Sequence, residues 1–253
     1  MKYTIHYSCI SHSGNCRSMN QDNYICICQF REIDSVDMKK PITGVVSADN
    51  TSLFGVFDGM GGEECGEVAS FIAAKDAKTL KFGKDIAKDL KKYCTETNES
   101  ICKYTEENMI SSMGTTAALL VFAKKKIVLC NIGDSKIFRV SDKIIEQISY
   151  DHVAISAYGT KPPLSQNLGI PPDELIIEPF ISKGKYHDGD IYLICSDGLT
   201  DMVGTDEIEQ VLINTPIEEA IVTLRNKALK NGGKDNITII LLDITRKKLF
   251  SKI

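Results

Sequence analysis

The chain contains no tryptophan, only four histidines and only seven prolines among 253 residues. No apolar run approaches the roughly 20 residues that span a bilayer, so we expect no membrane span. Residues 1–7 lack the apolar core of a signal peptide, which predicts a cytoplasmic protein. A net charge of −4 gives no general basic surface, and we therefore expect no nucleic-acid partner.

The nine cysteines are an odd number, and no two are spaced as Cys-x-x-Cys. This spacing excludes a zinc ribbon and a thioredoxin motif. We interpret the cysteines as small core residues in a reducing compartment. Cys26 and Cys28 flank Ile27 in an apparent strand, so their side chains are expected on the same face.

The hydrophobic pattern predicts strands, two helices, more strands, two helices and a last strand. Expected strands cover residues 2–10, 22–30, 44–48, 52–57, 114–122, 126–132, 136–140, 143–148, 175–181, 190–195 and 237–244, and expected helices cover residues 63–80, 84–108, 206–214 and 216–231. Short connections favour antiparallel pairing. This order excludes strict βαβ alternation and predicts one α+β domain with helix pairs on the faces of antiparallel sheets. The buried side of the second helix is expected to include Leu90, Tyr93, Ile101 and Tyr104.

Three aspartates follow or precede apolar strands, each beside glycine. Asp58 is followed by Gly-Met-Gly-Gly, Asp197 by Gly198, and Asp235 comes after Gly232 and Gly233. Three such carboxylates can converge at one edge of a sheet, where oxygen ligands suit Mg²⁺ or Mn²⁺ better than Zn²⁺. For Asp58 alone, the alternative is that the side chain caps the following helix.

Seven motifs in order resemble the metal-dependent type 2C serine/threonine phosphatases, in their bacterial form, over nearly the whole chain. They are Gly14-x-x-Arg17-x-x-Asn20-Gln21-Asp22, Asp58-Gly59-Met60-Gly61-Gly62, Met113-Gly114-Thr115-Thr116, Asn131-Ile132-Gly133-Asp134-Ser135-Lys136, Asp151-His152, Ser196-Asp197-Gly198-Leu199 and Asp235-Asn236-x-Thr238. The resemblance implies an antiparallel β-sandwich flanked by helix pairs, in four layers α-β-β-α. It further implies a phosphatase domain over residues 1–245 and a short basic tail over residues 246–253.

The resemblance also implies a site for two divalent cations, Mn²⁺ or Mg²⁺. Asp58 would bridge the two metals, and the backbone carbonyl of Gly59 would complete the ligands of the second metal. Asp197 and Asp235 would hold the first metal. The acidic residue that supports a third metal in bacterial relatives is replaced by Ser111 or Ser112, so we expect a third site to be weak or absent.

Two further residues receive roles from the same resemblance. Asp22 would orient metal-bound waters, and Arg17 would bind the substrate phosphate through its guanidinium fork. A metal-bridged water would then attack phosphorus directly, without a phosphoenzyme. Met60 stands where many eukaryotic members have a histidine proposed as general acid, and His12 is a candidate replacement. A solvated role for His12 is the alternative.

The resemblance predicts a phosphatase for phosphoserine and phosphothreonine proteins that opposes a bacterial Ser/Thr kinase. The alternatives are a catalytically weak relative that binds phosphoproteins and an enzyme dedicated to one regulator. The flap beside the active site, which helps to receive substrate in relatives, is shortened here to about residues 152–172. Substrate preference is therefore the property that the resemblance predicts least directly. We expect a monomer, because the catalytic domain fills the chain.

Overall fold

A computed structural model describes residues 2–60, 65–155 and 162–246. Within them, two antiparallel sheets are formed from strands distant in sequence. One sheet has the order β10 (Ile144–Gln147), β9 (Lys136–Ser141), β12 (Ile191–Cys195), β13 (Ile237–Arg246), β1 (Tyr3–His12) and β3 (Ile42–Ser47). The other has the order β11 (Phe180–Gly184), β8 (Lys126–Ile132), β7 (Ala117–Ala123), β4 (Ser52–Phe57) and β2 (Asn23–Cys26). A short ribbon pairs β5 (Gly59–Met60) with β6 (Gly114–Thr115).

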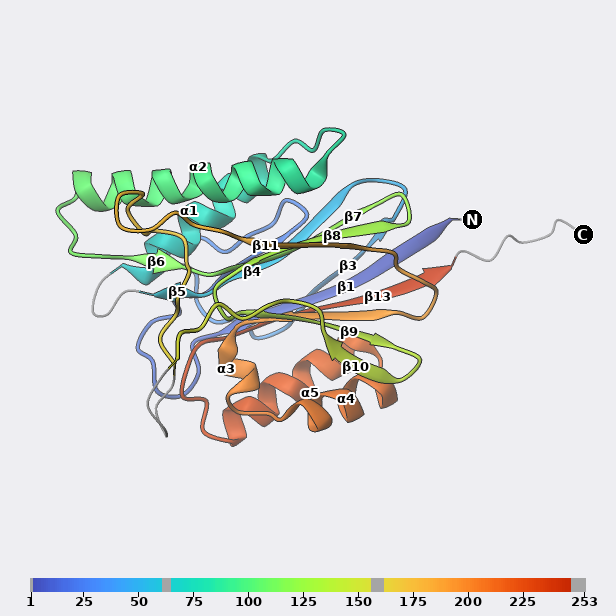
Figure 1. Cartoon of the computed structure of the whole chain (residues 1–253). Helices are drawn as coiled ribbons and strands as arrows, with labels where there is room; N and C mark the ends of the chain where they lie inside the picture. Colours follow the sequence, from blue (N-terminus) through green and yellow to red (C-terminus); the bar gives the residue numbers. More distant parts are fainter. Residues whose placement is uncertain (1, 61–64, 156–161, 247–253) are drawn as a thin grey trace, which may run out of the picture.

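The two sheets face each other, and helices cover both outer faces (Figure 1). Helices α1 (Gly66–Thr79) and α2 (Ile86–Glu107) pack on the five-stranded sheet, whereas α4 (Thr205–Asn214) and α5 (Ile217–Lys230) pack on the six-stranded sheet. The single turn α3 (Asp197–Thr200) follows β12. This arrangement confirms the predicted four-layer α+β sandwich. No helix among the described residues has the length and apolar character needed to cross a membrane.

Three apolar clusters correspond to the three interfaces between the layers. Between the sheets, the Phe122 ring lies 5.5 Å from the Tyr192 ring in an edge-to-face arrangement, a geometry that aromatic pairs favour. Between the helices, Tyr93 of α2 donates a 2.8 Å hydrogen bond to the carbonyl of Ala73 in α1. Small alanines on the buried side of α1, including Ala73, permit this close approach.

The structure corrects the predicted strand over residues 22–30. Strand β2 ends at Cys26, where backbone hydrogen bonds between Cys26 and Gln29 close a turn and Ile27 takes φ 66°. Cys26 is buried and Cys28 is exposed, so the expectation that both face one side was wrong. Ile25 and Ile27 alternate as in a strand, so the apolar pattern continues to Ile27. The chain has already turned there, and the sequence pattern therefore predicted a strand that is too long.

Two other expectations also fail. The predicted strand 175–181 begins only at Phe180, where pairing with β8 starts. Leu175 and Ile176 are exposed, which shows that local apolar character does not create a strand without a partner. Tyr104, in the last turn of α2, is 37% exposed, whereas Leu90 and Ile101 on the same helix are fully buried.

The predicted strand 114–122 divides into β6 and β7 at Thr116. At this break the Thr116 amide donates to the Asp58 carbonyl, at 2.9 Å, instead of continuing either strand. The interruption therefore attaches the end of β7 to the turn that follows β4.

Candidate active site

Asp58 is the first residue after β4, and two threonines fix its backbone. The Asp58 amide donates to the Thr116 hydroxyl at 2.9 Å, and the Thr115 hydroxyl donates to the Asp58 carbonyl at 3.0 Å. Helix α1 begins after Cys65, which makes no side-chain cap. The interpretation of Asp58 as a cap of this helix was therefore wrong. Thr115 and Thr116 therefore both support the turn that carries Asp58.

The glycine at position 59 is required by close packing. A Cβ added to Gly59 would lie 2.2 Å from the carbonyl oxygen of Gly66 and 2.3 Å from that of Gln21. Real Cβ atoms do not approach backbone this closely, so only glycine fits here. The contact places the start of α1, the segment before β2 and the Asp58 turn against one another.

Asp197 and Asp235 come from the ends of neighbouring strands β12 and β13. A Cβ on Gly198 would meet the carbonyl oxygen of Asn236 at 1.9 Å, so the two turns are pressed together. The Ser196 hydroxyl accepts from the Thr238 amide at 3.0 Å, which fixes the end of β12 against β13. The sandwich therefore brings both predicted carboxylates to one edge.

Asp22 is fully buried beside these turns. Its Oδ2 accepts a 2.7 Å hydrogen bond from the Ser196 hydroxyl, whereas its Oδ1 is buried without a hydrogen-bond partner. Burial raises the pKa of Asp22 to about 7; the Ser196 and Thr238 hydrogen bonds oppose the shift, and the charges of Asp197 and Asp235 add to it. A buried carboxylate oxygen without a donor is what a cation or its bound water would satisfy.

The pKa of Asp58 is also raised well above its usual value. Loss of solvation is the main cause, followed by the carboxylates of Asp22, Asp197, Asp134 and Asp235. This crowding of negative charge favours a divalent cation, and the donors are all oxygen atoms, as Mg²⁺ and Mn²⁺ prefer. The residues present therefore fit the predicted metals.

Arg17 contacts a predicted metal ligand directly. Its Nη2 donates to Asp235 Oδ2 at 2.7 Å, and the Arg17 side chain is 52% exposed. The hydrogen bond that Arg17 donates to Asp235, with smaller contributions from the charges of Asp58 and Asp197, raises the pKa of Arg17. Arg17 therefore lies beside the carboxylates in a position to meet an anionic ligand from solvent.

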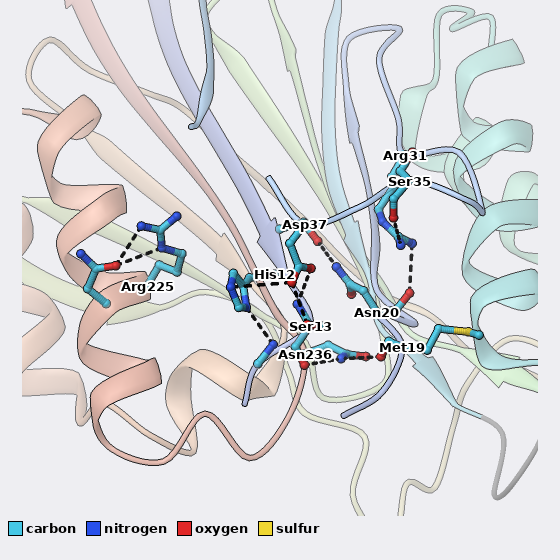
Figure 2. A network of polar contacts seen from close by, with 12 residues as sticks. His12, Ser13, Met19, Asn20, Arg31, Ser35, Asp37, Arg225 and Asn236 are labelled. Carbon is cyan, nitrogen blue, oxygen red and sulfur yellow. Dashed lines mark hydrogen bonds and ion pairs between the residues drawn. The ribbon is translucent and has the colours of Figure 1, made fainter. Parts of the chain in front are cut away.

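The loop that carries Arg17 is braced from two sides (Figure 2). Asp37 accepts hydrogen bonds from the amide and the hydroxyl of Ser13, at 2.7 and 2.8 Å. Asn236 donates through Nδ2 to the carbonyls of Ser13 and Met19, at 2.8 and 2.9 Å. The loop is thus fixed before and after Arg17, and Asn236 supports it from the turn before β13. No motif indicated Asp37, because its partner is 24 residues away.

A third support comes from the buried Arg31. It donates to the carbonyls of Asn20 and Ser35, at 3.0 and 2.7 Å (Figure 2). A buried guanidinium stabilised mainly by backbone carbonyls has no sequence motif, and sequence analysis missed it. Arg31 joins the loop before β2 to the connection that contains Asp37.

His12 makes contacts that favour a structural role. Its Nδ1 accepts a 2.9 Å hydrogen bond from the Gly14 amide, and its Nε2 lies 3.7 Å from Asp37 Oδ2. Both ring nitrogens therefore face protein groups in the Arg17 loop. The role of His12 as general acid stays a prediction, and its local contacts do not require it.

Among the described residues, no three His, Cys, Asp or Glu side chains form a preassembled metal cluster. The predicted ligands Asp58, Gly59, Asp197 and Asp235 share one edge of the sandwich, but their coordination of metal stays a prediction. Residues 61–64, which complete the Asp-Gly-Met-Gly-Gly motif, and residues 156–161 of the predicted flap lie outside the described residues.

The raised pKa of Asp22 predicts how the metal-free protein responds to pH. The folded value of about 7 exceeds the usual 3.8, so the neutral acid favours the folded state. This stabilisation is complete below pH 4 and is lost as pH rises through 7. In EDTA, we expect the free energy of unfolding to fall by about 2–4 kcal/mol over this range because of Asp22. Denaturant titrations at several pH values measure the fall.

An Asp22→Asn variant should show a weaker pH dependence than the unsubstituted protein in EDTA. An exposed-site control, Asp49→Asn, should retain the full dependence, because Asp49 is exposed in a turn. Equal pH dependence in all three proteins would show that Asp22 does not titrate as inferred.

Comparison with known proteins agrees with this geometry. The family described as protein phosphatase 2C matches residues 24–157. The chain is 32% identical over 222 residues to the serine/threonine phosphatase stp of Listeria monocytogenes serotype 4b, covering 79% of this chain and 88% of that protein. It is 30% identical over 222 residues to the serine/threonine protein phosphatase PstP of Mycobacterium tuberculosis, covering 79% of this chain and 43% of that protein.

Solved structures show the same fold. The crystal structure of Mycobacterium tuberculosis PstP superposes with a TM-score of 0.78 at 26% identity, covering 96% of this chain and 100% of that chain. A structure of the PstP catalytic domain in complex with two manganese ions superposes with a TM-score of 0.76 at 26% identity over the same shares of both chains. Together, the family match and the sequence identity to stp show that this chain belongs to the protein phosphatase 2C family.

Proposed function

We propose that the chain is a metal-dependent protein serine/threonine phosphatase that hydrolyses phosphoserine and phosphothreonine. The observation that carries the proposal is the convergence of Asp22, Asp58, Asp197, Asp235 and Arg17 at one edge of the sandwich. Relatives that carry the name serine/threonine phosphatase, and the manganese complex of the PstP catalytic domain, support it.

Asp58, the Gly59 carbonyl, Asp197 and Asp235 would hold two Mn²⁺ or Mg²⁺ ions. When bound, two such ions supply a nucleophilic water of lowered pKa and neutralise charge on the phosphoryl oxygens. Asp22 would hold water in place through its buried Oδ1, since its Oδ2 is already fixed by Ser196. A third metal site remains predicted to be weak or absent.

Arg17 would bind the substrate phosphate. A guanidinium offers two parallel N–H donors to phosphate oxygens and keeps its charge at any working pH. The braced loop holds the backbone of Arg17 while half of its side chain stays open to solvent. Phosphate binding would exchange the contact with Asp235 for contacts with the substrate, and would stabilise the charge that develops on the equatorial oxygens.

Met60 has no proton to donate to the leaving alkoxide. The proton would then come from water, and His12 remains an alternative donor. The contacts of His12 with Gly14 and Asp37 make water the simpler choice.

The biological setting extends the same proposal. Phosphorylated proteins would be the substrates, a bacterial Ser/Thr kinase would oppose the enzyme, and the protein would act as a cytoplasmic monomer. The catalytic domain would span residues 1–245, with residues 246–253 as a basic tail.

The second candidate function is a weak relative that binds phosphoproteins without efficient turnover. The Arg17–Asp235 ion pair favours this second function, because it joins the proposed phosphate-binding residue to a proposed metal ligand and so competes with both roles. Turnover separates the two candidates.

The direct test is hydrolysis of a phosphothreonine peptide with manganese, with magnesium and with EDTA. We expect release of phosphate only with a divalent cation, at about 10 per second, near the middle of the ordinary range for enzymes. Calorimetry with manganese should be run on the same protein. Metal binding without turnover would favour the binding function, and turnover in EDTA would overturn the metal-dependent mechanism.

A further inference from the structure

A cavity of about 800 Å³ lies next to the active-site turn. The C-terminal half of α2 forms one wall and residues 167 and 169–174 form a second wall, and the lining is completed by Met60 of β5 and residues 111–114. Figure 1 shows α2, β5 and β6 near one another at the end of the molecule that carries the active-site turns. Met60 lines the cavity and is only two residues from Asp58.

The walls are joined by specific hydrogen bonds. Asn98 of α2 accepts from the amides of Gly169 and Ile170, at 2.7 and 3.1 Å, and donates to the Ile170 carbonyl at 2.8 Å. Thr115 of β6 exchanges two 2.9 Å backbone hydrogen bonds with Leu168. The cavity is therefore built into the fold, and the same Thr115 supports Asp58.

The charges around the cavity are predominantly negative. The exposed carboxylates Glu99 and Glu106 come from α2, and the exposed carboxylates Asp173 and Glu174 come from the second wall. Among the described residues, Lys103 is the one lysine of the lining, and its Nζ lies 3.7 Å from Glu107 outside the cavity. Acidic side chains thus face the opening from both walls.

Cys102, also in the lining, lies within the electrostatic influence of carboxylates from both walls. Burial raises the pKa of its thiol, and the charges of Glu174, Asp173 and Glu99 raise it further. The remaining surface includes apolar groups such as Met60, Met113 and Ile170. Apolar walls below an acidic rim suit lysine and arginine, whose methylene stems pack on apolar surface while their charged ends stay at the rim.

We propose that this cavity binds a lysine- or arginine-containing segment of the phosphoprotein substrate, beside the phosphorylated residue. The inference rests on the proposed phosphatase function and adds a preference for basic sequence. An extended peptide advances about 3.3 Å per residue, so basic residues a few positions from the phosphothreonine would reach the cavity. Charge complementarity selects a basic peptide over an acidic one.

The test compares phosphothreonine peptides that carry three arginines before the phosphothreonine, three arginines after it, or glutamates in the same places. We expect one of the arginine peptides to have the lowest KM. The Glu99→Gln, Glu174→Gln double variant should raise that KM about five- to ten-fold. The KM for p-nitrophenyl phosphate, which is too small to reach the cavity, should not change.

The matched control is the Glu96→Gln, Glu178→Gln double variant. It removes the same charge from α2 and from the segment after residue 174, but neither residue lines the cavity. Equal KM changes in the two double variants, or no preference for arginine in the unsubstituted protein, would overturn the inference. Loss of p-nitrophenyl phosphate hydrolysis in every protein would instead count against the proposed function.

Binding gives a readout that does not depend on turnover. A fluorescent, dephosphorylated form of the preferred arginine peptide should bind the unsubstituted protein, and binding should weaken with added salt. The Glu99→Gln, Glu174→Gln variant should weaken binding by about the same factor as it raises KM. Unchanged binding in this variant would overturn the inference.

Discussion

An Asp58→Asn variant is expected to lose manganese-dependent phosphopeptide hydrolysis by about a thousand-fold or more, while its metal-free form becomes more stable. The loss follows because Asp58 is predicted to bridge both ions, whose stabilisation of transition-state charge amounts to several kcal/mol. The gain follows because the pKa of Asp58 is raised by burial and by neighbouring carboxylates. Near neutral pH, folding therefore requires Asp58 either to be buried as an anion or to take up a proton, and asparagine requires neither.

Two measurements check this prediction. Initial rates with saturating manganese give the activity, and denaturant titration in EDTA at pH 8 gives the free energy of unfolding, which should rise by about 1–3 kcal/mol. Asp49→Asn, in an exposed turn, serves as the control and should change neither quantity appreciably. Retained activity in Asp58→Asn would contradict its assignment, and lower metal-free stability would contradict the electrostatic argument.

An Arg17→Ala variant is expected to lower the kcat/KM for phosphopeptide and to raise the affinity for manganese. Phosphopeptide kcat/KM should fall about a hundred-fold, because a charged donor to the phosphoryl oxygens is lost. Manganese affinity should rise about two- to ten-fold, because the variant removes a cation that is 2.7 Å from Asp235 and half exposed to solvent. If Arg17 had a purely structural role, the variant would lower both kcat/KM and manganese affinity.

Steady-state kinetics and calorimetry measure these two effects separately. Arg17→Lys should recover part of the kcat/KM, since lysine keeps the charge but lacks the bidentate fork. Arg225→Ala is a matched arginine control, because Arg225 lies on α5 and its side-chain hydrogen bonds within the described part of the chain go to Asn226 (Figure 2). Weaker manganese binding in Arg17→Ala would contradict the inferred competition for Asp235.

The four long helices were predictable from local pattern, whereas the four-layer order came from the family resemblance. Helix α2 was expected over residues 84–108 and spans Ile86–Glu107, because Leu90, Tyr93 and Ile101 recur at helical spacing and are buried. The strand errors arose where pairing, and not composition, decides the outcome. Residues 175–181 are apolar enough for a strand, but only Phe180 and the residues after it reach β8.

Only those site residues that belong to sequence motifs could be predicted. Asp58, Asp197 and Asp235 were singled out because each aspartate lies beside glycine at the end of an apolar strand. Asp37 and Arg31 were missed, because their roles consist of contacts with backbone groups elsewhere in the chain. Such contacts leave no fixed spacing in sequence.

By itself, the sequence determined the chemistry available to this protein: an oxygen-rich set of carboxylates, an arginine, and glycines where backbones meet. The order of helices and strands followed from hydrophobic periodicity, which acts over a few residues. Only the tertiary structure decided that Arg17 contacts Asp235, 218 residues away, and that the acidic residues of α2 face those of residues 173–174 across a cavity. The physical reason is that side-chain electrostatics and packing depend on distance in space, and strand pairing between distant segments sets those distances.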